Sequence, residues 1–238
     1  MIDEGVSVII PVFNDHEALK RAIPESIRAL SEITDTFEIL VAEDGSTDRS
    51  AELVRDWQIR DPRVILLHAD ERLGRGRALN RTIKSANYGI VCYYDVDLAT
   101  DIAHLPELVG AIHVGADIAT GSRLMPDSDI IRSGKREIAS QGYNLLVRTI
   151  LGSHLHDHQC GFKSFRKEQI LSLIPDIEAT HWFWDTEVLI RGERKGLEIT
   201  EFPVVWNEGP GTTVRFSDVF SMGSQIMKLW WQLRVAKD

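Results

Sequence analysis

The chain has 238 residues, of which 43% are hydrophobic and 26% charged, and its formal net charge is −9 at pH 7. A chain of this length can bury one hydrophobic core, so we expect a single domain that spans residues 1–238. The negative charge argues against a nucleic-acid partner, since no basic excess is available to neutralise phosphates. A net negative charge does not exclude a local basic pocket.

Cysteine content and apolar runs bear on the compartment. The two cysteines, Cys92 and Cys160, give no disulfide framework, and Cys92 lies in an apolar run typical of a core strand. The first residues lack the basic and apolar stretches of a secretory signal, and no run of about 18 apolar residues could span a bilayer. We expect a cytoplasmic protein whose membrane role is peripheral or supplied by a segment outside this sequence.

The first half of the chain alternates strand and helix signals. Apolar, β-branched runs at 6–12, 37–42, 64–67 and 90–94 predict four strands. Segments with apolar residues at helical spacing lie between them, and the third begins at the turn Gly74-Arg75-Gly76. Such alternation predicts an α/β protein with a mostly parallel sheet and helices on both faces.

The second half is less regular and is expected to build on the same sheet. The sequence predicts helices at 102–113, 133–151 and 182–195, and strands at 117–120, 161–165 and 197–206. Pro203 lies inside the last of these strands, which therefore belongs near an edge of the sheet. A final helix is expected from about residue 217 to residue 238.

Two carboxylates mark the end of the fourth expected strand. The apolar run 91–94 is followed by Asp95, Val96 and Asp97. Because strand residues two apart point to the same side, Asp95 and Asp97 can converge at the carboxyl end of a buried strand, where open α/β sheets bind ligands. Two hard oxygen donors there suit Mg²⁺ or Mn²⁺ carrying a diphosphate. The alternative is a strand that simply ends in polar turn residues.

Polar residues also follow the first two expected strands. Phe13 and Asp15 follow the first, and Asp44 lies in the turn after the second. At this edge an aromatic ring can stack on a base, and a carboxylate can accept hydrogen bonds from ribose or base. The alternative for residues 44–48 is a turn that caps a helix, with Ser46 or Thr47 as the N-cap, and one loop can do both.

A glycine-containing turn follows the third expected strand. Its sequence, Leu73-Gly74-Arg75-Gly76, resembles a phosphate-binding loop, although a helix start with an exposed arginine explains it equally well. It follows the third strand and lacks a third glycine at the required spacing, so it is no dinucleotide fingerprint.

Taken in order, the motifs at the four strand ends resemble those of the inverting glycosyltransferases of family 2, which have the GT-A fold. The motifs are Pro-x-Phe-Asn-Asp, Glu-Asp-Gly-Ser-x-Asp, Leu-Gly-x-Gly and Asp-x-Asp. Segments 157–163, 184–189 and 203–211 make the chain similar to polyprenyl-phosphate glycosyltransferases, most closely the dolichyl-phosphate β-glucosyltransferases and next the dolichyl-phosphate mannose synthases. The resemblance covers residues 6 to about 215 and implies an α/β GT-A fold with a mostly parallel central sheet flanked by helices.

This resemblance implies roles by position. The residues that match nucleotide-sugar contacts are Pro11, Phe13, Asp15, Asp44, Asp95, Val96, Asp97 and Arg123, with Phe13 for a tyrosine and Asp15 for a glutamate. Asp95 and Asp97 match the metal pair, which implies Mg²⁺ or Mn²⁺ as cofactor, and Arg123 matches an arginine near the phosphates. Arg136 and Ser140 lie four apart on one helix face and match a pair that holds the acceptor phosphate.

Two positions depart from the family pattern. Ala99 stands where the mannose synthases carry Gln, so water or phosphate would fill the place of a third metal ligand. The family's Gly-Ser-Lys loop near the last helix reads Gly211-Thr212-Thr213, without the lysine. Arg215 could supply that positive charge.

The implied reaction is a single in-line displacement that inverts the anomeric carbon. It moves a hexose, glucose from UDP-glucose, to a polyprenyl phosphate at the cytoplasmic face of a membrane. Asp97 and Arg123 would stabilise the leaving diphosphate. The acceptor phosphate is largely ionised at neutral pH, because its second pKa is about 6, so it needs cations more than a base.

Two sets of residues have competing interpretations. Asp185 and Glu187 are two apart on a helix, so at most one faces the site; we favour Glu187 as an orienting residue, with a structural salt bridge as the alternative. His154, His156 and His158 lie at every second position, which could place them on one side of an extended segment. No fourth ligand supports a zinc site, so we expect them to be loop histidines that face solvent.

The final helix also has two interpretations. It combines apolar and aromatic residues with Lys228, Arg234 and Lys237. It either packs on the sheet or lies at a membrane interface, and both can hold.

Four other functions compete with this one. Two are close: a GDP-mannose-dependent polyprenyl-phosphate mannosyltransferase, and a family 2 transferase with a soluble or cell-wall sugar acceptor. A third is a nucleotide-sugar-binding protein without turnover, against which the intact Asp95 and Asp97 speak. The fourth is a nucleotidyltransferase, which would carry a glycine-rich loop directly after the first strand, where Pro11 to Asp15 stand instead.

Overall fold

A computed structural model describes residues 1–131, 134–207 and 216–235 of the chain; at 134–136, 216–222 and 235 it describes the backbone alone. Seven strands form one sheet in the order β3-β2-β1-β4-β7-β5-β8. These strands are β1 (Val6–Val12), β2 (Phe37–Glu43), β3 (Val64–Leu67), β4 (Ile90–Tyr94), β5 (Ile118–Ser122), β7 (Phe162–Arg166) and β8 (Ile199–Pro203).

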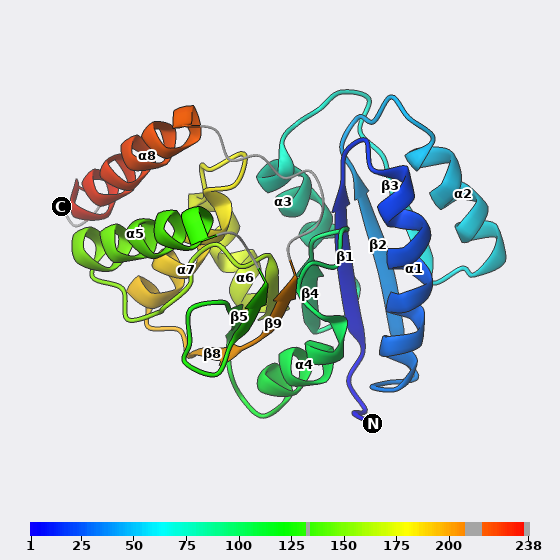
Figure 1. The fold of residues 1–238 in the computed structure, drawn as a ribbon. Coiled ribbons are helices and arrows are strands. Elements are labelled where there is room, and N and C mark those ends of the chain that lie inside the picture. Colours follow the sequence, from blue (N-terminus) through cyan, green and yellow to red (C-terminus); the bar gives the residue numbers. More distant parts are fainter. Residues whose placement is uncertain (132–133, 208–215, 236–238) are drawn as a thin grey trace.

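The sheet is mixed but mostly parallel. Strands β1, β2, β3 and β4 run parallel to one another, and so do β5 and β8, whereas β7 lies antiparallel between β4 and β5. Strands from both halves of the chain therefore share one sheet. The carboxyl ends of β1, β2 and β4 meet at one edge, the top of the sheet in Figure 1.

Alternate strand residues enter two cores. On one face, Val8 and Cys92 pack with α1 (His16–Ser31), α2 (Ser50–Arg60) and α4 (Leu105–His113). On the other, Ile9 and Tyr93 pack with α3 (Arg75–Ser85), α6 (Lys167–Leu173) and α7 (Trp184–Lys195). The expectation of helices on both faces, with Cys92 in the core, is confirmed.

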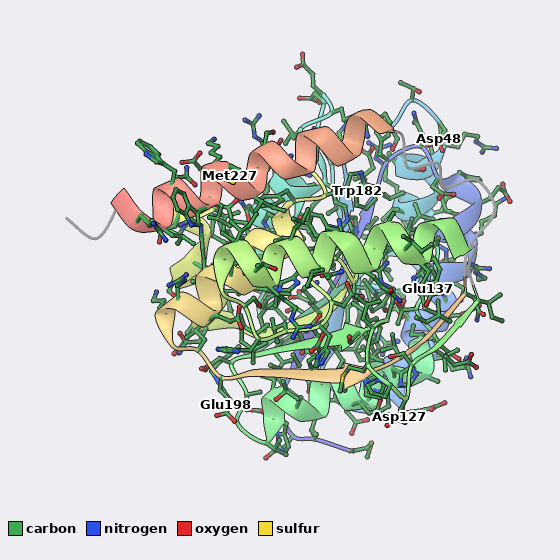
Figure 2. The ribbon with its side chains drawn as sticks, turned by 60° about the vertical axis from the view of Figure 1, so that its left-hand side comes forward. Asp48, Asp127, Glu137, Trp182, Glu198 and Met227 are labelled. Atoms are coloured by element: carbon green, nitrogen blue, oxygen red, sulfur yellow. The ribbon has the colours of Figure 1, made fainter. Side chains whose placement is uncertain are left out.

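Two further helices form a layer outside α7. Helices α5 (Gly134–Leu151) and α8 (Phe216–Val235) share a small core with it, built from Val147, Leu151, Phe183, Ile190, Ile226 and Leu229. Figure 1 shows both helices on the left of the molecule, and Figure 2 shows them side by side at its front. The final helix thus packs on other helices rather than on the sheet. None of the described helices is both long and apolar enough to cross a bilayer.

Most expected elements are present, with differences at three places. The strand expected at 197–206 is two: β8 closes at Pro203, and β9 (Val205–Asn207) pairs with β6 (Asp129–Ile131) in a separate two-stranded sheet. The expected position of Pro203 near a sheet edge is confirmed, because β8 is the last strand of its sheet. The helix expected at 102–113 begins with a 3₁₀ turn (Ile102–His104), and another such turn (Ile174–Asp176) follows α6.

The third difference is the start of α2. The expected N-cap at Ser46 or Thr47 is wrong, because the helix begins at Ser50. Asp48 instead accepts a hydrogen bond from the Ser50 amide at 2.9 Å. Ser46 and Thr47 bond to Asn14 in the loop after β1, so they join two loops at the sheet edge rather than capping a helix.

Candidate active site

Two loops at the carboxyl ends of β1 and β4 form the centre of the candidate site. Each contains a non-glycine residue with a positive φ of 52°, Asn14 in the first and Leu98 in the second. Such backbone is uncommon for leucine and costs of the order of 1–3 kcal/mol, so the surrounding contacts must hold it. Neighbouring bonds do so: Leu98 N donates to Asp95 O at 3.1 Å, and Asn14 N donates to Ser46 Oγ at 2.9 Å.

Asp15 and Asp95 lie near enough to Asp97 to act on it electrostatically, and we call these three side chains the carboxylate cluster. Burial raises the pKa of Asp97, and the neighbouring charges of Asp95 and Asp15 raise it further. The Ala99 amide, which donates to Asp97 Oδ1 at 3.0 Å, and the Arg21 cation only partly offset this rise. Asp15 also caps α1 by accepting from the Ala18 amide. Burial and like charges therefore oppose ionisation of Asp97.

The donor set of this cluster fits a divalent cation in part. Carboxylate oxygens of Asp95 and Asp97 are the ligands that Mg²⁺ and Mn²⁺ prefer. Among the described residues, however, no three His, Cys, Asp or Glu side chains are grouped to hold a metal ion. The two aspartates could bind a cation only together with oxygens from a diphosphate or water, as the alanine at position 99 implies.

Arg75 ties Asp95 to a buried charge network. Its Nε and Nη2 donate to Asp95 Oδ1 at 3.1 and 2.7 Å, and its Nη1 donates to Asp185 Oδ2 at 2.6 Å. Lys163 Nζ, fully buried, lies 3.1 Å from Asp185 Oδ1. Burial lowers the pKa of Lys163 to about 8. The Arg75 side chain is only 11% exposed, so the alternative interpretation of this turn, a helix start with an exposed arginine, is wrong about the exposure.

Burial opposes charge on Arg75, but its two carboxylate partners outweigh that effect and raise its pKa. The guanidinium also lies 5.1 Å from the ring centres of Tyr93 and Trp182. Arg75 is thus a permanent cation behind Asp95. The sequence signal for it was present in the Gly74-Arg75-Gly76 turn, but its partners come from the loop after β4 and from α7, which no local pattern reveals.

The two acids of α7 point to different places. Asp185 joins Arg75 and Lys163 behind the carboxylate cluster. Glu187 accepts from the amides of Glu178 and Ala179 and forms an ion pair with Arg191 at 2.7 Å. Glu187 therefore forms a structural salt bridge, which was its alternative interpretation. Asp185 is the acid of this helix that lies next to the site.

Arg123 is anchored by another buried acid. Its Nε and Nη2 donate to the two carboxylate oxygens of Asp157 at 2.7 and 3.0 Å, and its backbone N donates to the same group. Burial would raise the pKa of Asp157, but Arg123 reverses this and holds it well below its usual range. Asp95 is close enough to contribute to the raised pKa of Arg123. Arg123 is thus a cation fixed by Asp157, and its charge interacts with that of Asp95.

The remaining nucleotide-contact candidates surround the same edge. Pro11 is buried in β1 beside Ala42, and Val96 is half-buried against the core. The ring of Phe13, expected to stack on a base, lies 3.9 Å from the guanidinium carbon of Arg72. Arg72 gave no sequence signal, because its loop position carries no motif.

Asp44 has a structural task in the same region. Its carboxylate accepts from the amides of Leu73 and Gly74 at 2.8 and 2.9 Å, and it is 4% exposed. The Gly76 amide donates to Thr180 O at 2.9 Å. These amides are already bonded within the protein, so the turn does not present the free N–H groups of a phosphate-binding loop.

The acceptor-phosphate candidates are only partly described. Ser140 lies on α5, and its Oγ is buried without a hydrogen-bond partner among the described residues. The side chain of Arg136 and the whole of Arg215 lie outside the described residues, as does the 211–213 loop. An orphaned hydroxyl such as that of Ser140 fits a group that a ligand would satisfy.

The three alternating histidines are separated by their surroundings. His154 and His156 are exposed, as expected, but the expectation fails for His158, which is fully buried. Its Nδ1 donates to Asn144 Oδ1 at 2.8 Å, and its Nε2 accepts from Ser153 Oγ at 2.7 Å. Burial lowers the pKa of His158 to about 4, so it is a neutral structural residue near pH 7.

A model of the family described as Glycosyl transferase family 2 matches residues 7–171. The chain therefore belongs to this family and is a glycosyltransferase. It is 44% identical over 234 residues to Glycosyltransferase AglD of Haloferax volcanii, which covers 97% of this chain and 38% of AglD. This chain thus spans well under half the length of that relative.

Two other relatives match over most of their own length. The dolichyl-phosphate beta-glucosyltransferase of Dictyostelium discoideum is 28% identical over 239 residues, which cover 94% of this chain and 73% of that protein. The polyprenol monophosphomannose synthase of Mycolicibacterium smegmatis is 27% identical over 210 residues, covering 84% and 77%.

Solved structures share the fold. Glucosyl-3-phosphoglycerate synthase from Mycobacterium tuberculosis, in complex with Mn²⁺, uridine diphosphate and glucosyl-3-phosphoglycerate, matches with a TM-score of 0.68 at 20% identity. The match covers 97% of this chain and 80% of that one. The expected GT-A fold, with its mostly parallel sheet flanked by helices, is confirmed.

Proposed function

We propose that this glycosyltransferase moves glucose from UDP-glucose to a polyprenyl phosphate of the dolichyl type, with inversion at the anomeric carbon. The carrying observation is the cluster of Asp15, Asp95 and Asp97 at the sheet edge, where burial and like charges raise the pKa of Asp97. A site of this kind gains from a cation that arrives with a diphosphate. The dolichyl-phosphate beta-glucosyltransferase relative supports the sugar and the acceptor.

Asp95 and Asp97 would hold Mg²⁺ or Mn²⁺, which when bound acts as a Lewis acid on the leaving diphosphate. Arg123, held by Asp157 and close enough to Asp95 for their charges to interact, would bind the same phosphates. Pro11, Phe13, Asp15, Asp44 and Val96 would contact the nucleoside. Arg75 and Asp185 would keep Asp95 in place.

The acceptor side would use Ser140, with Arg136 and Arg215 as cations. A phosphate oxygen of the acceptor forms the new bond to C1, while the bond between C1 and the diphosphate oxygen breaks and its electron pair leaves with the diphosphate. Since the acceptor phosphate is ionised at neutral pH, no proton has to be removed. The contacts of Glu187 with Arg191 and the 178–179 amides leave it an indirect role through α7.

A donor screen tests this proposal. Purified protein is incubated with radiolabelled UDP- or GDP-sugars, Mg²⁺ or Mn²⁺, and a short polyprenyl phosphate, and the label that chloroform extracts is counted. We expect transfer from UDP-glucose, and a loss of about 10²-fold or more in Asp97→Ala. Asp56→Ala, which removes an exposed carboxylate of α2, is the control and keeps full activity. Transfer only to water-soluble sugar acceptors would refute the lipid acceptor.

A second candidate is a GDP-mannose-dependent polyprenyl-phosphate mannosyltransferase. The likeness to polyprenol monophosphomannose synthase over 84% of this chain favours it. Extractable label from GDP-mannose alone would select it. Under either reaction we propose that the protein works peripherally at the cytoplasmic face of a membrane, because the acceptor is anchored there.

A further inference from the structure

A lysine lies in the middle of the sheet, close to the candidate site. Among the lysines whose side chains the structure describes, only Lys163 is buried, and its exposed fraction is 0%. It lies on β7, opposite Tyr93 of β4 and Thr120 of β5. An ammonium without partners would be very costly in such a place, so its contacts must compensate for the lost water. No step of the proposed reaction uses this group.

The two acceptors of Lys163 come from separate parts of the chain. Its Nζ donates to the carbonyl of Cys160, in the segment just before β7, and to Asp185 Oδ1 at 3.1 Å. Asp185 belongs to the first turn of α7. Lys163 therefore ties the segment before β7 to the start of α7.

These contacts are part of a closed ring that holds Asp95 at two points. The residue after Cys160 is Gly161, whose carbonyl accepts from the Asp95 amide at 3.1 Å. The Asp95 carboxylate accepts from Arg75 at 2.7 Å, and Arg75 donates to Asp185 at 2.6 Å. Lys163 joins Asp185 back to Cys160. It is thus the member that connects the backbone attachment of Asp95 with its side-chain attachment.

The charge of Lys163 is as important as its length. Burial raises the pKa of Asp185, and the Arg75 cation opposes that rise. Arg75 is shared, because its Nε and Nη2 also donate to Asp95. Lys163 supplies a second cation to Asp185. An apolar side chain in its place would leave two carboxylates dependent on one guanidinium.

The surroundings make this charge sensitive to pH. Burial lowers the pKa of Lys163 to about 8; the charges of Arg75 and Arg123 lower it too, whereas Asp157 and Cys160 raise it. Burial raises the pKa of Cys160 itself to about 11, so its thiol stays neutral where the lysine titrates. The charged and titratable groups around Lys163 are Tyr93 on β4, Arg75 on α3, Arg123 after β5, Asp185 on α7, and Asp157, His158 and Cys160 before β7.

We propose that Lys163 is a positioning residue for sugar transfer: its ammonium closes the ring of contacts around Asp95, and transfer depends on its charge. The inference rests on the proposed function, since Asp95 would bind the metal that carries the donor diphosphate. Because Lys163 is fully buried, it acts through Asp185 and the 160–161 segment and not on donor or acceptor directly.

Hydrogen exchange followed by mass spectrometry tests the ring without any substrate. Lys163→Met removes the charge and keeps a long apolar side chain. We expect faster exchange in the segments 93–98 and 158–163, because the acceptor of the Asp95 amide is no longer held, and wild-type exchange in β1, β2 and β3. Lys84→Met, at an exposed position of α3, is the control and should exchange like the wild type throughout.

Two results would overturn the ring. One is wild-type protection of 93–98 in Lys163→Met. The other is faster exchange along the whole chain, which would assign Lys163 to the stability of the fold alone.

The pH profile of transfer with Mg²⁺ tests the charge. Wild-type kcat should fall above about pH 8, where the ammonium loses its proton. Lys163→Met should be at least about tenfold slower below pH 8 and lack this fall, since a small displacement of Asp95 is costly. Its KM for the acceptor should be unchanged, because Ser140 lies outside the ring. An unchanged kcat, or the same alkaline fall in both proteins, would overturn the proposal.

The wild type carries a second test that needs no variant. In protein labelled with ¹³C at the lysine ε-carbons, one resonance should titrate near pH 8, and exposed lysines near 10.4. The alkaline fall in kcat should share the midpoint of that resonance, and clearly different midpoints would refute control by Lys163. No transfer under any condition, together with faster exchange at 93–98 in Lys163→Met, would refute the proposed function and leave the ring intact.

Discussion

Arg75 is the residue that joins the carboxylate cluster to a buried acid of α7. Among the described residues, only Arg75 forms ion pairs with both Asp95 and Asp185. Asp185 is 2% exposed, and such a carboxylate is stable as an anion only with its partners in place. Arg75 thus links a candidate metal ligand to the buried helix α7.

Replacing this arginine should therefore cost stability as well as activity. Arg75→Ala leaves Asp185 with Lys163 alone and Asp95 without its donor, so we expect the free energy of unfolding to fall by about 3–5 kcal/mol. The double variant Arg75→Ala/Asp185→Asn should lose less, because one unpaired charge is gone. Urea unfolding measures both. Arg49→Ala, which breaks an exposed ion pair with Glu52, should unfold like the wild type. An Arg75→Ala protein as stable as wild type would contradict this account.

His158 should make stability depend on pH. Its folded-state pKa of about 4 lies below the ordinary 6.5, so the unfolded chain binds the proton more readily between these values. Stability from this residue is complete above pH 6.5 and is lost as the pH falls towards 4, by up to about 3 kcal/mol. His158→Gln should show a correspondingly flatter pH profile in urea unfolding. His154→Gln, at an exposed position, should follow the wild type; identical profiles for all three proteins would exclude His158 as the cause.

At the scale of the elements, the site depends on close approach between loops. The loop after β4 meets the segment before β7 at Gly161, whose carbonyl accepts from the Asp95 amide at 3.1 Å. A Cβ at position 161 would overlap Asp95 Oδ2 and approach Arg75 Nη2 to 3.0 Å. Only glycine lets the Asp95 carboxylate keep its position beside Arg75.

Gly161→Ala should therefore displace Asp95. A shift of about 1 Å at a reacting centre costs about 10²-fold in rate, so we expect a loss of this size in sugar transfer. Binding of Mn²⁺ in the presence of UDP, followed by the electron paramagnetic resonance of the free ion, should weaken as well. Gly110→Ala is the control, because a Cβ there meets no atom within 4 Å. Unchanged Mn²⁺ binding in Gly161→Ala would show that Asp95 does not need this approach.

At the scale of the whole molecule, the family match ends before the fold does. The match covers residues 7–171, yet β8 completes the sheet beside β5, and Trp184 of α7 is fully buried against Tyr93 and Phe165. The later segment is thus part of the same core. Its removal would expose one face of β5 and β7.

Truncation tests this dependence. A chain of residues 1–175 lacks α7 and β8, so we expect no cooperative thermal unfolding, because a fully buried Trp alone contributes about 3–5 kcal/mol. A chain of residues 1–207 keeps all seven strands of the sheet and lacks α8, which packs on α5 and α7. It should still unfold cooperatively, at a lower midpoint, in circular dichroism melts. A folded 1–175 protein would show that the first part forms an independent unit.

Local patterns were sufficient for most of the elements. Strands β1, β3 and β4 have the bounds that their apolar runs predicted, and the edge position of Pro203 followed from its missing N–H. Strand order was less accessible, because the antiparallel placement of β7 depends on where α5 and the 152–161 loop return the chain. The break between β8 and β9 was missed because β9 pairs with β6, a strand that no sequence pattern had indicated.

Within the site, the sequence by itself determined which chemical groups were present and which strand ends carried them, because side-chain alternation and the parallel sheet bring Asp15, Asp44, Asp95 and Asp97 to one edge. Only the tertiary structure decided their partners. Arg75 reaches Asp185 across 110 positions, and Arg123 reaches Asp157 across 34. Whether a histidine or an arginine is solvated or paired depends on its burial. Burial is a property of the packed molecule and cannot be predicted from a single position of the chain.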